Sequence, residues 1–157
     1  MLNEVERLWI ERAVLCWLAT SSADGMPSVS PKEIYAVHGD QIVIANVASP
    51  NSVRNIRANG RACVAFLDVF RQKGIQVFGQ AEIIDSTDGR FDGLAAPLRA
   101  IAGDAFVFKT LFAITPQTVK PIIAPRYRFF PGTTEEDQVE SAMQSYGVRP
   151  HVVEDPV

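Results

Sequence analysis

The loop from Ala48 to Ser52 carries residue types from which an anion-binding site can be built. It reads Ala-Ser-Pro-Asn-Ser, a run of turn formers, and Asn51 or Ser52 is suited to cap a helix that continues through Val53 and Ile56. The first N–H groups of a helix have no partner inside the helix and favour a negatively charged group. The loop therefore predicts a site for a phosphate-bearing cofactor.

Strand-like segments stand on both sides of this loop. Ser28 to Val37 and Gln41 to Asn46 are rich in β-branched residues and flank His-Gly-Asp, in which Gly39 can take the positive φ of a tight hairpin turn. After the short helix, Arg61 to Asp68 is a nearly continuous apolar run with the length of a buried strand. The pattern predicts a hairpin, a short helix and a further strand.

The order of these elements resembles a known family. A G-x-P tripeptide precedes the first strand at Gly25–Pro27, and the motif S-x-R-N-I-R-x-N-x-R begins at Ser52. With the apolar strand that follows, these motifs resemble the pyridoxamine 5'-phosphate oxidase-like, FMN-binding split-barrel family over about Trp17 to Ile84. The resemblance implies an antiparallel split barrel and a homodimer that binds FMN between its two subunits.

The resemblance also implies which residues hold the cofactor. In the family, the phosphate is held by the second strand of the hairpin, the following loop and the start of the short helix. Carried over by alignment, the cofactor-binding residues are Ser30, Pro31 and Lys32 on the first strand, Ala45 and Asn46 at the end of the second, and Asn51, Ser52 and Arg54 at the cap. Lys73, just before a later strand, aligns with a position that reaches the flavin from the partner subunit.

The chain departs from the family in the charge around the phosphate. The authentic oxidases carry an Arg-Lys pair at the helix start, where this chain has Asn-Ser, and an Arg and a Lys on the first strand, where it has Ser30 and Tyr35. We expect Lys32 or Arg54 to supply the principal positive charge, with backbone N–H groups and hydroxyls supplying other hydrogen bonds. The alternative is that both are solvated surface charges.

Residues 1–14 predict an amphipathic N-terminal helix. Asn3 and Glu6 have the spacing of a capping box. One face of this helix carries the apolar residues Val5, Leu8, Trp9 and Ala13. The apolar run Leu15 to Thr20 then predicts a strand, and Asp24-Gly25 predicts a hairpin turn after it.

The second half of the chain predicts further strands and helices. Gly74 to Ile84 predicts a strand with a bulge or a close backbone approach at Gly79. Residues 88–102 have helical spacing interrupted by Gly93 and Pro97, which predicts a broken or two-part helix. The remaining predicted elements are strands at Phe106–Thr115 and Val119–Ala124 around a turn at Thr115–Gln117, and a helix capped by Thr133, with Glu136 at capping-box spacing, that ends near Gly147.

These elements predict one domain over residues 1–157, of mainly β (α+β) class. We expect an antiparallel split β-barrel of about six strands with flanking helices, followed over residues 133–157 by a C-terminal helix and tail. The composition, 47% hydrophobic and 21% charged over 157 residues, is that of one ordinary globular domain.

Two segments bear on the ligand. Phe106, Phe108 and Phe112 form a stripe that we interpret as core, with a wall for a planar ring as the alternative. The segment from Tyr127 to Pro131 resembles the Y-R-x-x-P of the true oxidases, in which the arginine contacts the pyridoxal substrate, but the I-E-F-W-type ending of those enzymes does not follow. The resemblance therefore does not extend to pyridoxamine 5'-phosphate as substrate.

Composition and motifs argue against several other classes. A formal net charge of −3 and a pI near 5.4 argue against a nucleic-acid or anionic-membrane binder, and no apolar run reaches membrane-spanning length. The acidic N-terminus lacks the features of a secretory signal, which predicts a cytoplasmic protein. Cys16 and Cys63 are expected as buried reduced thiols, and His38 and His151 lack the supporting residues of a metal site.

Two classes of function follow from the resemblance. The first is an FMN-dependent oxidoreductase that exchanges electrons or hydride with a small-molecule substrate, in which the flavin carries the redox chemistry. The second is a non-catalytic binding protein on the same fold that holds FMN, haem or a deazaflavin.

Overall fold

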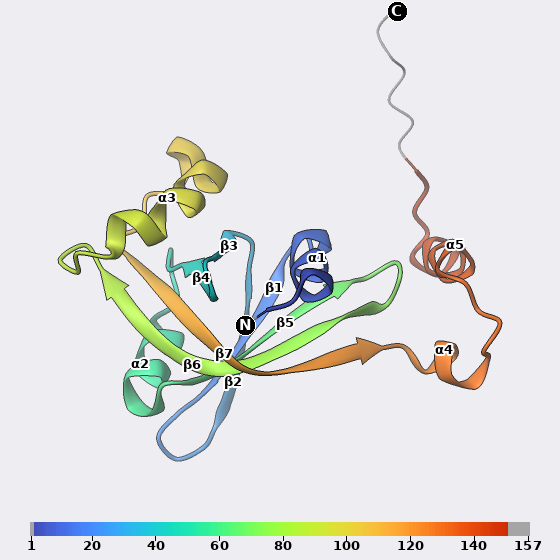
Figure 1. The fold of residues 1–157 in the computed structure, drawn as a ribbon, viewed down its shortest axis with the longest axis horizontal. Helices are drawn as coiled ribbons and strands as arrows, with labels where there is room; N and C mark the ends of the chain where they lie inside the picture. The colour runs from blue at the N-terminus through green and yellow to red at the C-terminus, as the bar shows by residue number, and fades with distance from the viewer. Residues whose placement is uncertain (1, 151–157) are drawn as a thin grey trace, which may run out of the picture.

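One curled antiparallel sheet organises the protein (Figure 1). The computed structural model describes residues 2–150. Its elements are α1 (Glu4–Arg12), β1 (Cys16–Ser21), β2 (Pro27–Lys32), β3 (Tyr35–His38), β4 (Gln41–Ala45), α2 (Pro50–Asn59), β5 (Arg61–Asp68), β6 (Lys73–Asp85), α3 (Phe91–Ala102), the 3-10 turn η1 (Gly103–Ala105), β7 (Thr110–Ile123), α4 (Pro125–Phe129) and α5 (Glu135–Tyr146). Seven strands of the described chain pair in the order β2-β1-β5-β6-β7-β4-β3. The predicted split barrel is confirmed, with one strand more than expected.

The barrel is split between β2 and β3, which are the two edge strands of the sheet. Only Glu33 and Ile34 join these strands along the chain. The sheet must therefore curl until its two edges meet at that junction. The prediction of one strand over Ser28–Val37 was wrong for this reason: its first part pairs with β1 and its second part pairs with β4. Pro27 and Pro31 are tolerated in β2 because an edge strand has N–H positions that need no partner.

Two predicted interruptions in the second half of the chain are absent from the described structure. Thr115-Pro116-Gln117 is not a turn, because β7 runs through it as one strand and takes up the extra residue in a bulge opposite Phe78 and Gly79. Of the bulge or close backbone approach predicted at Gly79, the close approach is confirmed, while the bulged residue lies opposite it in β7. A Cβ there would lie 2.2 Å from the Thr115 carbonyl oxygen, so the close strand approach requires glycine.

Helix α3 is also continuous, although Pro97 lies inside it. Its buried face, which includes Leu94, Ala95 and Leu98, belongs to an apolar cluster with residues of β4 and β7. Burial of this face outweighs the hydrogen bond that proline removes. Tertiary packing therefore overrides the local signal.

A second apolar cluster fills the barrel. Phe66, Phe112 and Leu18 are among its fully buried side chains, and helices α1 and α2 contribute Ile10 and Ile56 to it. A buried hydrogen bond from the Asn55 amide to the Thr20 hydroxyl, 3.0 Å long, ties α2 to β1. The two helices thus pack on the inner face of the sheet.

The helix caps were predicted well at one end of the chain and shifted at the other. The capping box of Asn3 and Glu6 is present in α1. The predicted apolar face was wrong in part, because Val5 and Leu8 are exposed while Ile10 and Ala13 are buried. The cap of α5 lies one residue later than predicted, with Thr134 and Asp137 in the capping box. Gly147 ends α5 with positive φ, as predicted. The last part of the predicted tail, residues 151–157, lies outside the described residues.

Candidate functional site

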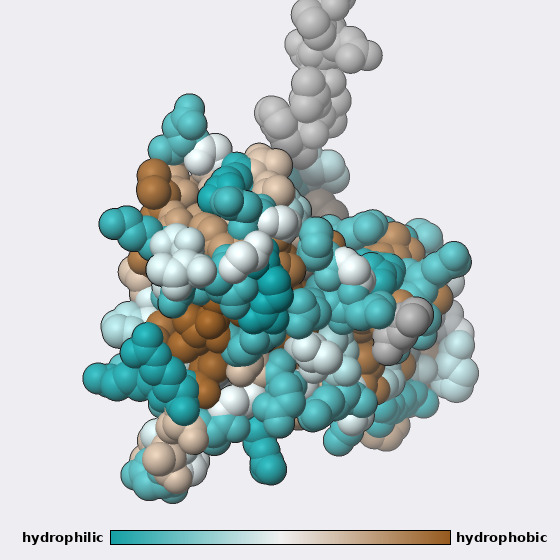
Figure 2. All heavy atoms as spheres, turned by 60° about the vertical axis from the view of Figure 1, so that its left-hand side comes forward, coloured by the Kyte–Doolittle hydropathy of each residue, from teal (hydrophilic) through white to brown (hydrophobic). Residues whose placement is uncertain are grey.

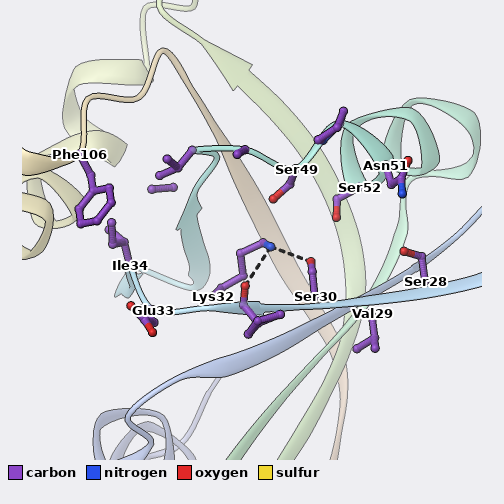
Figure 3. A pocket seen from close by; sticks show the side chains of 15 residues that line it. Ser28, Val29, Ser30, Lys32, Glu33, Ile34, Ser49, Asn51, Ser52 and Phe106 are labelled. Atoms are coloured by element: carbon purple, nitrogen blue, oxygen red, sulfur yellow. Dashed lines mark hydrogen bonds between the residues drawn. The ribbon is translucent and has the colours of Figure 1, made fainter.

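A cleft of about 460 Å³ opens where the barrel is split. This volume lies within the range of small-molecule sites. Strand β2, the junction after it, the end of β4, the following loop and the start of α2 form its walls (Figure 3). The residues lining it are Ser28, Val29, Ser30, Pro31, Lys32, Glu33, Ile34, Ala45, Val47, Ala48, Ser49, Pro50, Asn51, Ser52 and Phe106.

Lys32 provides the positive charge of this cleft. The residue is only 9% exposed, and its amine donates hydrogen bonds to Ser30 Oγ at 2.6 Å and to the Pro31 carbonyl at 3.1 Å. None of the ion pairs formed within residues 2–150 includes Lys32. Burial lowers the pKa of the Lys32 amine, because the charged form loses hydration without gaining a carboxylate. A bound anion would supply the missing partner.

The start of α2 adds further donors to the same part of the cleft. Ser49 is the N-cap and Pro50 occupies the first turn, but the Ser49 side chain makes no capping hydrogen bond. Its hydroxyl and that of the buried Ser52 point toward the part of the cleft that holds Lys32 and Ser30 (Figure 3). The first N–H groups of α2 have no intrahelical acceptor. Hydroxyls, helix N–H groups and one buried ammonium therefore converge, as a phosphate requires.

The opposite end of the cleft combines apolar side chains with the Glu33 carboxylate (Figure 3). The ring of Phe106 stands beside Ile34, away from the serine hydroxyls (Figure 3). Val47 lines the cleft as well and is exposed. The cleft thus offers a cationic end at Lys32 and an aromatic end at Phe106, with the Glu33 carboxylate beside the aromatic end.

Six of the nine predicted cofactor residues line the cleft, and three do not. The six are Ser30, Pro31, Lys32, Ala45, Asn51 and Ser52. Asn46 instead shapes the loop, since its amide donates to Thr110 Oγ1 and its oxygen accepts from the Ser49 N–H. Arg54 is exposed and donates to the Asn51 side chain. Lys73 pairs with Glu135 at 3.0 Å, lies over the Tyr127 ring and does not line this cleft.

Two residues of the site escaped the sequence analysis. Ser49, rather than Asn51 or Ser52, is the N-cap of α2. Pro50 indicates this in the sequence, because proline favours the first position of a helix. Phe106 was assigned to the core with Phe108 and Phe112, but it is 51% exposed. No local signal separates it from its two buried companions.

Burial raises the pKa values of two groups behind the cleft. Burial raises the pKa of the Cys16 thiol to about 12, an effect that the nearby Lys32 charge opposes. Burial likewise raises the pKa of Tyr35 to about 12, and its hydroxyl donates to the Ala13 carbonyl. Cys16 and Cys63 are both free thiols, the second only half-buried. Glu33 and Lys32 are the ionisable side chains among the described residues of the cleft lining.

The outer face of the sheet beside the cleft is apolar. Side chains of directly paired residues share a face, so that Trp17 lies beside Pro31 on one strand and Ala65 on another. Trp17 is 44% exposed. Because α1 and α2 pack on the inner face through Ile10 and Ile56, neither covers this one. An apolar surface thus adjoins the cleft at Pro31.

Comparison with known proteins identifies the family. The family profile described as pyridoxamine 5'-phosphate oxidase matches residues 2–128. The chain belongs to this family. The match confirms the resemblance seen in the motifs between Trp17 and Ile84 and extends it across the whole sheet and into α4. A search of curated proteins found no match.

Solved structures with this fold bind different ligands. The HupZ protein of Group A Streptococcus has a TM-score of 0.65 at 21% identity, over 76% of this chain and 92% of its own. An FMN-binding protein from Syntrophomonas wolfei has a TM-score of 0.63 at 17% identity, over 76% and 84%. HutZ, the heme storage protein of Vibrio cholerae, has a TM-score of 0.63 at 15% identity, over 78% and 95%. At these identities the likeness establishes the fold alone.

Residues 2–150 hold no cluster of three His, Cys, Asp or Glu side chains arranged to bind a metal ion. His38 lies at the end of β3, and His151 is outside the described residues. Within the same part of the chain, none of the helices combines the length and the apolar character needed to cross a bilayer.

Proposed function

We propose that the protein is an FMN-binding oxidoreductase of the pyridoxamine 5'-phosphate oxidase family. The observation that carries this proposal is the buried Lys32 amine, which faces the cleft beside three serine hydroxyls and has no carboxylate partner among the described residues. Burial disfavours the charged form of this amine, and an anion bound in the cleft would compensate for the hydration that the amine loses. The phosphate of FMN is such an anion.

The residues of the cleft divide into those that bind the phosphate and those that hold the loop before α2. Lys32 and the hydroxyls of Ser30, Ser49 and Ser52 bind the phosphate, and the N–H groups at the start of α2 add hydrogen bonds to it. Asn46 holds the loop before α2 in place through its bonds to Thr110 and Ser49. Bound FMN would supply the electron-transfer chemistry, with a small molecule as its reaction partner. The protein's part is to orient the cofactor and to limit the access of water.

We further propose that the protein is a homodimer with two equivalent cofactor sites across a twofold axis. The apolar outer face around Trp17 and Ala65 suits a dimer contact, because homodimer interfaces are apolar. If the same face of a second copy packs against it, the contact is isologous. Pro31 belongs to this face and also to the cleft wall. A second copy on this face would therefore stand beside the cofactor, where Lys73 of the partner is expected to contribute.

A non-catalytic haem or flavin carrier is the second candidate, because HutZ, which shares this fold, is a heme storage protein. Haem iron in proteins is usually held by a histidine, cysteine, methionine or tyrosine. The cleft lining within residues 2–150 contains none of these four side chains, and His38 lies at the far end of β3. The donor set therefore favours FMN over haem.

The experiment that tests this function is identification of the ligand that co-purifies. The protein is purified without added cofactor and denatured, and the released ligand is identified by absorption and mass spectrometry. FMN supports the proposal. A Soret band from haem, together with failure of the apoprotein to bind added FMN, would overturn it. Turnover of the FMN form with NADH or NADPH and an electron acceptor then separates an enzyme from a carrier.

A further inference from the structure

The cleft carries one exposed aromatic side chain that the phosphate site does not use. Phe106 is 51% exposed, whereas Phe108 and Phe112 of the same run are buried in the core. Single exposed apolar residues are common on protein surfaces and need no explanation. Phe106 differs because it lines the cleft that holds Lys32 (Figure 3).

The backbone on both sides of Phe106 fixes where this ring stands. Helix α3 ends at Ala102, its C-cap Gly103 turns the chain into η1 with a φ of 56°, and Phe106 follows in extended conformation. The chain is anchored before this turn by the buried Ala102 and after it by Phe108, which packs edge-on against Phe91 with ring centroids 6.4 Å apart. The short linker therefore presents the Phe106 ring between two buried anchors.

The ring stands among apolar side chains and the Glu33 carboxylate, which leaves its face available to a flat group (Figure 3). Ile34 lies beside Phe106, and Val47 lines the same cleft. The face of the molecule that brings α2 and α3 forward shows apolar surface exposed between polar side chains (Figure 2). The Lys32 amine and the Ser49 hydroxyl lie farther along the cleft (Figure 3). A ligand that fits both ends has an anionic group at one end and a flat aromatic body at the other.

We propose that Phe106 is a specificity-determining residue that stacks on the fused ring of the ligand and selects a planar aromatic ligand among phosphate-bearing molecules. This inference rests on the FMN site proposed above and adds the residue that recognises the isoalloxazine ring. Offset stacking of two aromatic systems stabilises their contact beyond what the buried area alone contributes. Loss of the ring should weaken binding on the order of 10-fold.

The experiment compares FMN, riboflavin and ribose 5-phosphate as probes. Their dissociation constants are measured by flavin fluorescence titration and by calorimetry on the full chain, freed of ligand, and on the Phe106→Ala, Phe106→Tyr and Lys32→Met variants. Val107→Ala is the matched control, because Val107 is 81% exposed on the same linker and does not line the cleft.

Phe106→Ala should weaken FMN and riboflavin alike, leave ribose 5-phosphate unchanged and reduce the quenching of flavin fluorescence. Phe106→Tyr should restore flavin binding, and Val107→Ala should match the wild type. Lys32→Met should weaken FMN and ribose 5-phosphate but not riboflavin. Wild-type affinity and quenching in Phe106→Ala, with FMN still bound tightly, would overturn the inference on Phe106 alone. Failure of the wild-type protein to bind any flavin would overturn the proposed function and this inference with it.

Discussion

Replacement of Lys32 by methionine separates a cofactor-binding role from a structural one. Lys32→Met keeps most of the aliphatic side chain but removes the charge that faces the cleft. A hydrogen bond to a charged group contributes about 1.5–3 kcal/mol. The dissociation constant of FMN should therefore rise by about one to two decades. Riboflavin, which has no phosphate, should bind the variant as it binds the wild type.

The same substitution should not destabilise the ligand-free protein. Burial lowers the pKa of Lys32, so the unfolded chain binds its proton more tightly than the folded chain does. The stability of the ligand-free wild type should accordingly increase as the pH rises from the lowered pKa of the folded state toward the ordinary lysine value. Lys32→Met should remove this pH dependence and should melt no lower than the wild type near neutral pH.

Calorimetric titration with FMN and riboflavin, together with thermal melts of the ligand-free protein, measures all of these quantities. Arg54→Met tests the other predicted cation, and Lys109→Met is the matched control because Lys109 is exposed and outside the cleft lining. We expect the free energies of unfolding and of FMN binding of both variants to stay within about 0.5 kcal/mol of the wild-type values, because surface substitutions usually have small effects. An equal loss of FMN and riboflavin in Lys32→Met, with a lower melting temperature, would refute the reasoning and make Lys32 a structural residue.

Three further predictions concern the dimer and the fold. Trp17→Glu should convert the dimer to a monomer in sedimentation analysis and weaken FMN binding, because it introduces a charge into the apolar outer face; a dimer that persists would count against that interface. Thr20→Val leaves the buried Asn55 amide without its acceptor and should lower the free energy of unfolding by about 1–3 kcal/mol, measured in urea. An unchanged urea midpoint would mean that another acceptor replaces the Thr20 hydroxyl. Gly79→Ala should lower the melting temperature, since its Cβ would lie 2.2 Å from a backbone oxygen of β7. Gly93→Ala, with open space around the new Cβ, should raise the melting temperature. A higher melting temperature for Gly79→Ala than for Gly93→Ala would contradict the geometry.

Features that depend on a few neighbouring residues were predictable from the sequence. The turn at Asp24-Gly25 has Gly25 at positive φ, and Gly39 forms the β3–β4 turn in the same way. The capping box of α1 and the glycine that ends α5 also follow from local residue types. These signals are short-range, because each depends on one backbone conformation that few residues adopt.

Features that depend on distant partners were not predictable. Nothing local in Ser28–Val37 indicates that its two halves pair with strands at opposite edges of the sheet. Pro116 reads as a turn signal, but β7 takes up the extra residue Gln117 in a bulge opposite Phe78 and Gly79 and continues as one strand. Pro97 reads as a helix breaker, but the buried face of α3 keeps the helix intact. In each case, packing outweighs the local preference.

The same division applies to the candidate site. The loop before α2 could be located from its turn residues, and the family motif indicated β2 as the opposite wall. The sequence left Lys32 and Arg54 equivalent, because only the curl of the sheet buries the first and leaves the second exposed. It also grouped Phe106 with two core residues, since the turn after α3 that exposes it depends on anchors at Ala102 and Phe108.

A crystal structure of the protein with FMN would show directly which residues hold the phosphate. We expect the phosphate within hydrogen-bonding distance of Lys32 Nζ and of the Ser30, Ser49 and Ser52 hydroxyls, at the start of α2. FMN bound elsewhere on the molecule, or a phosphate held by Arg54 with Lys32 turned away, would contradict this expectation.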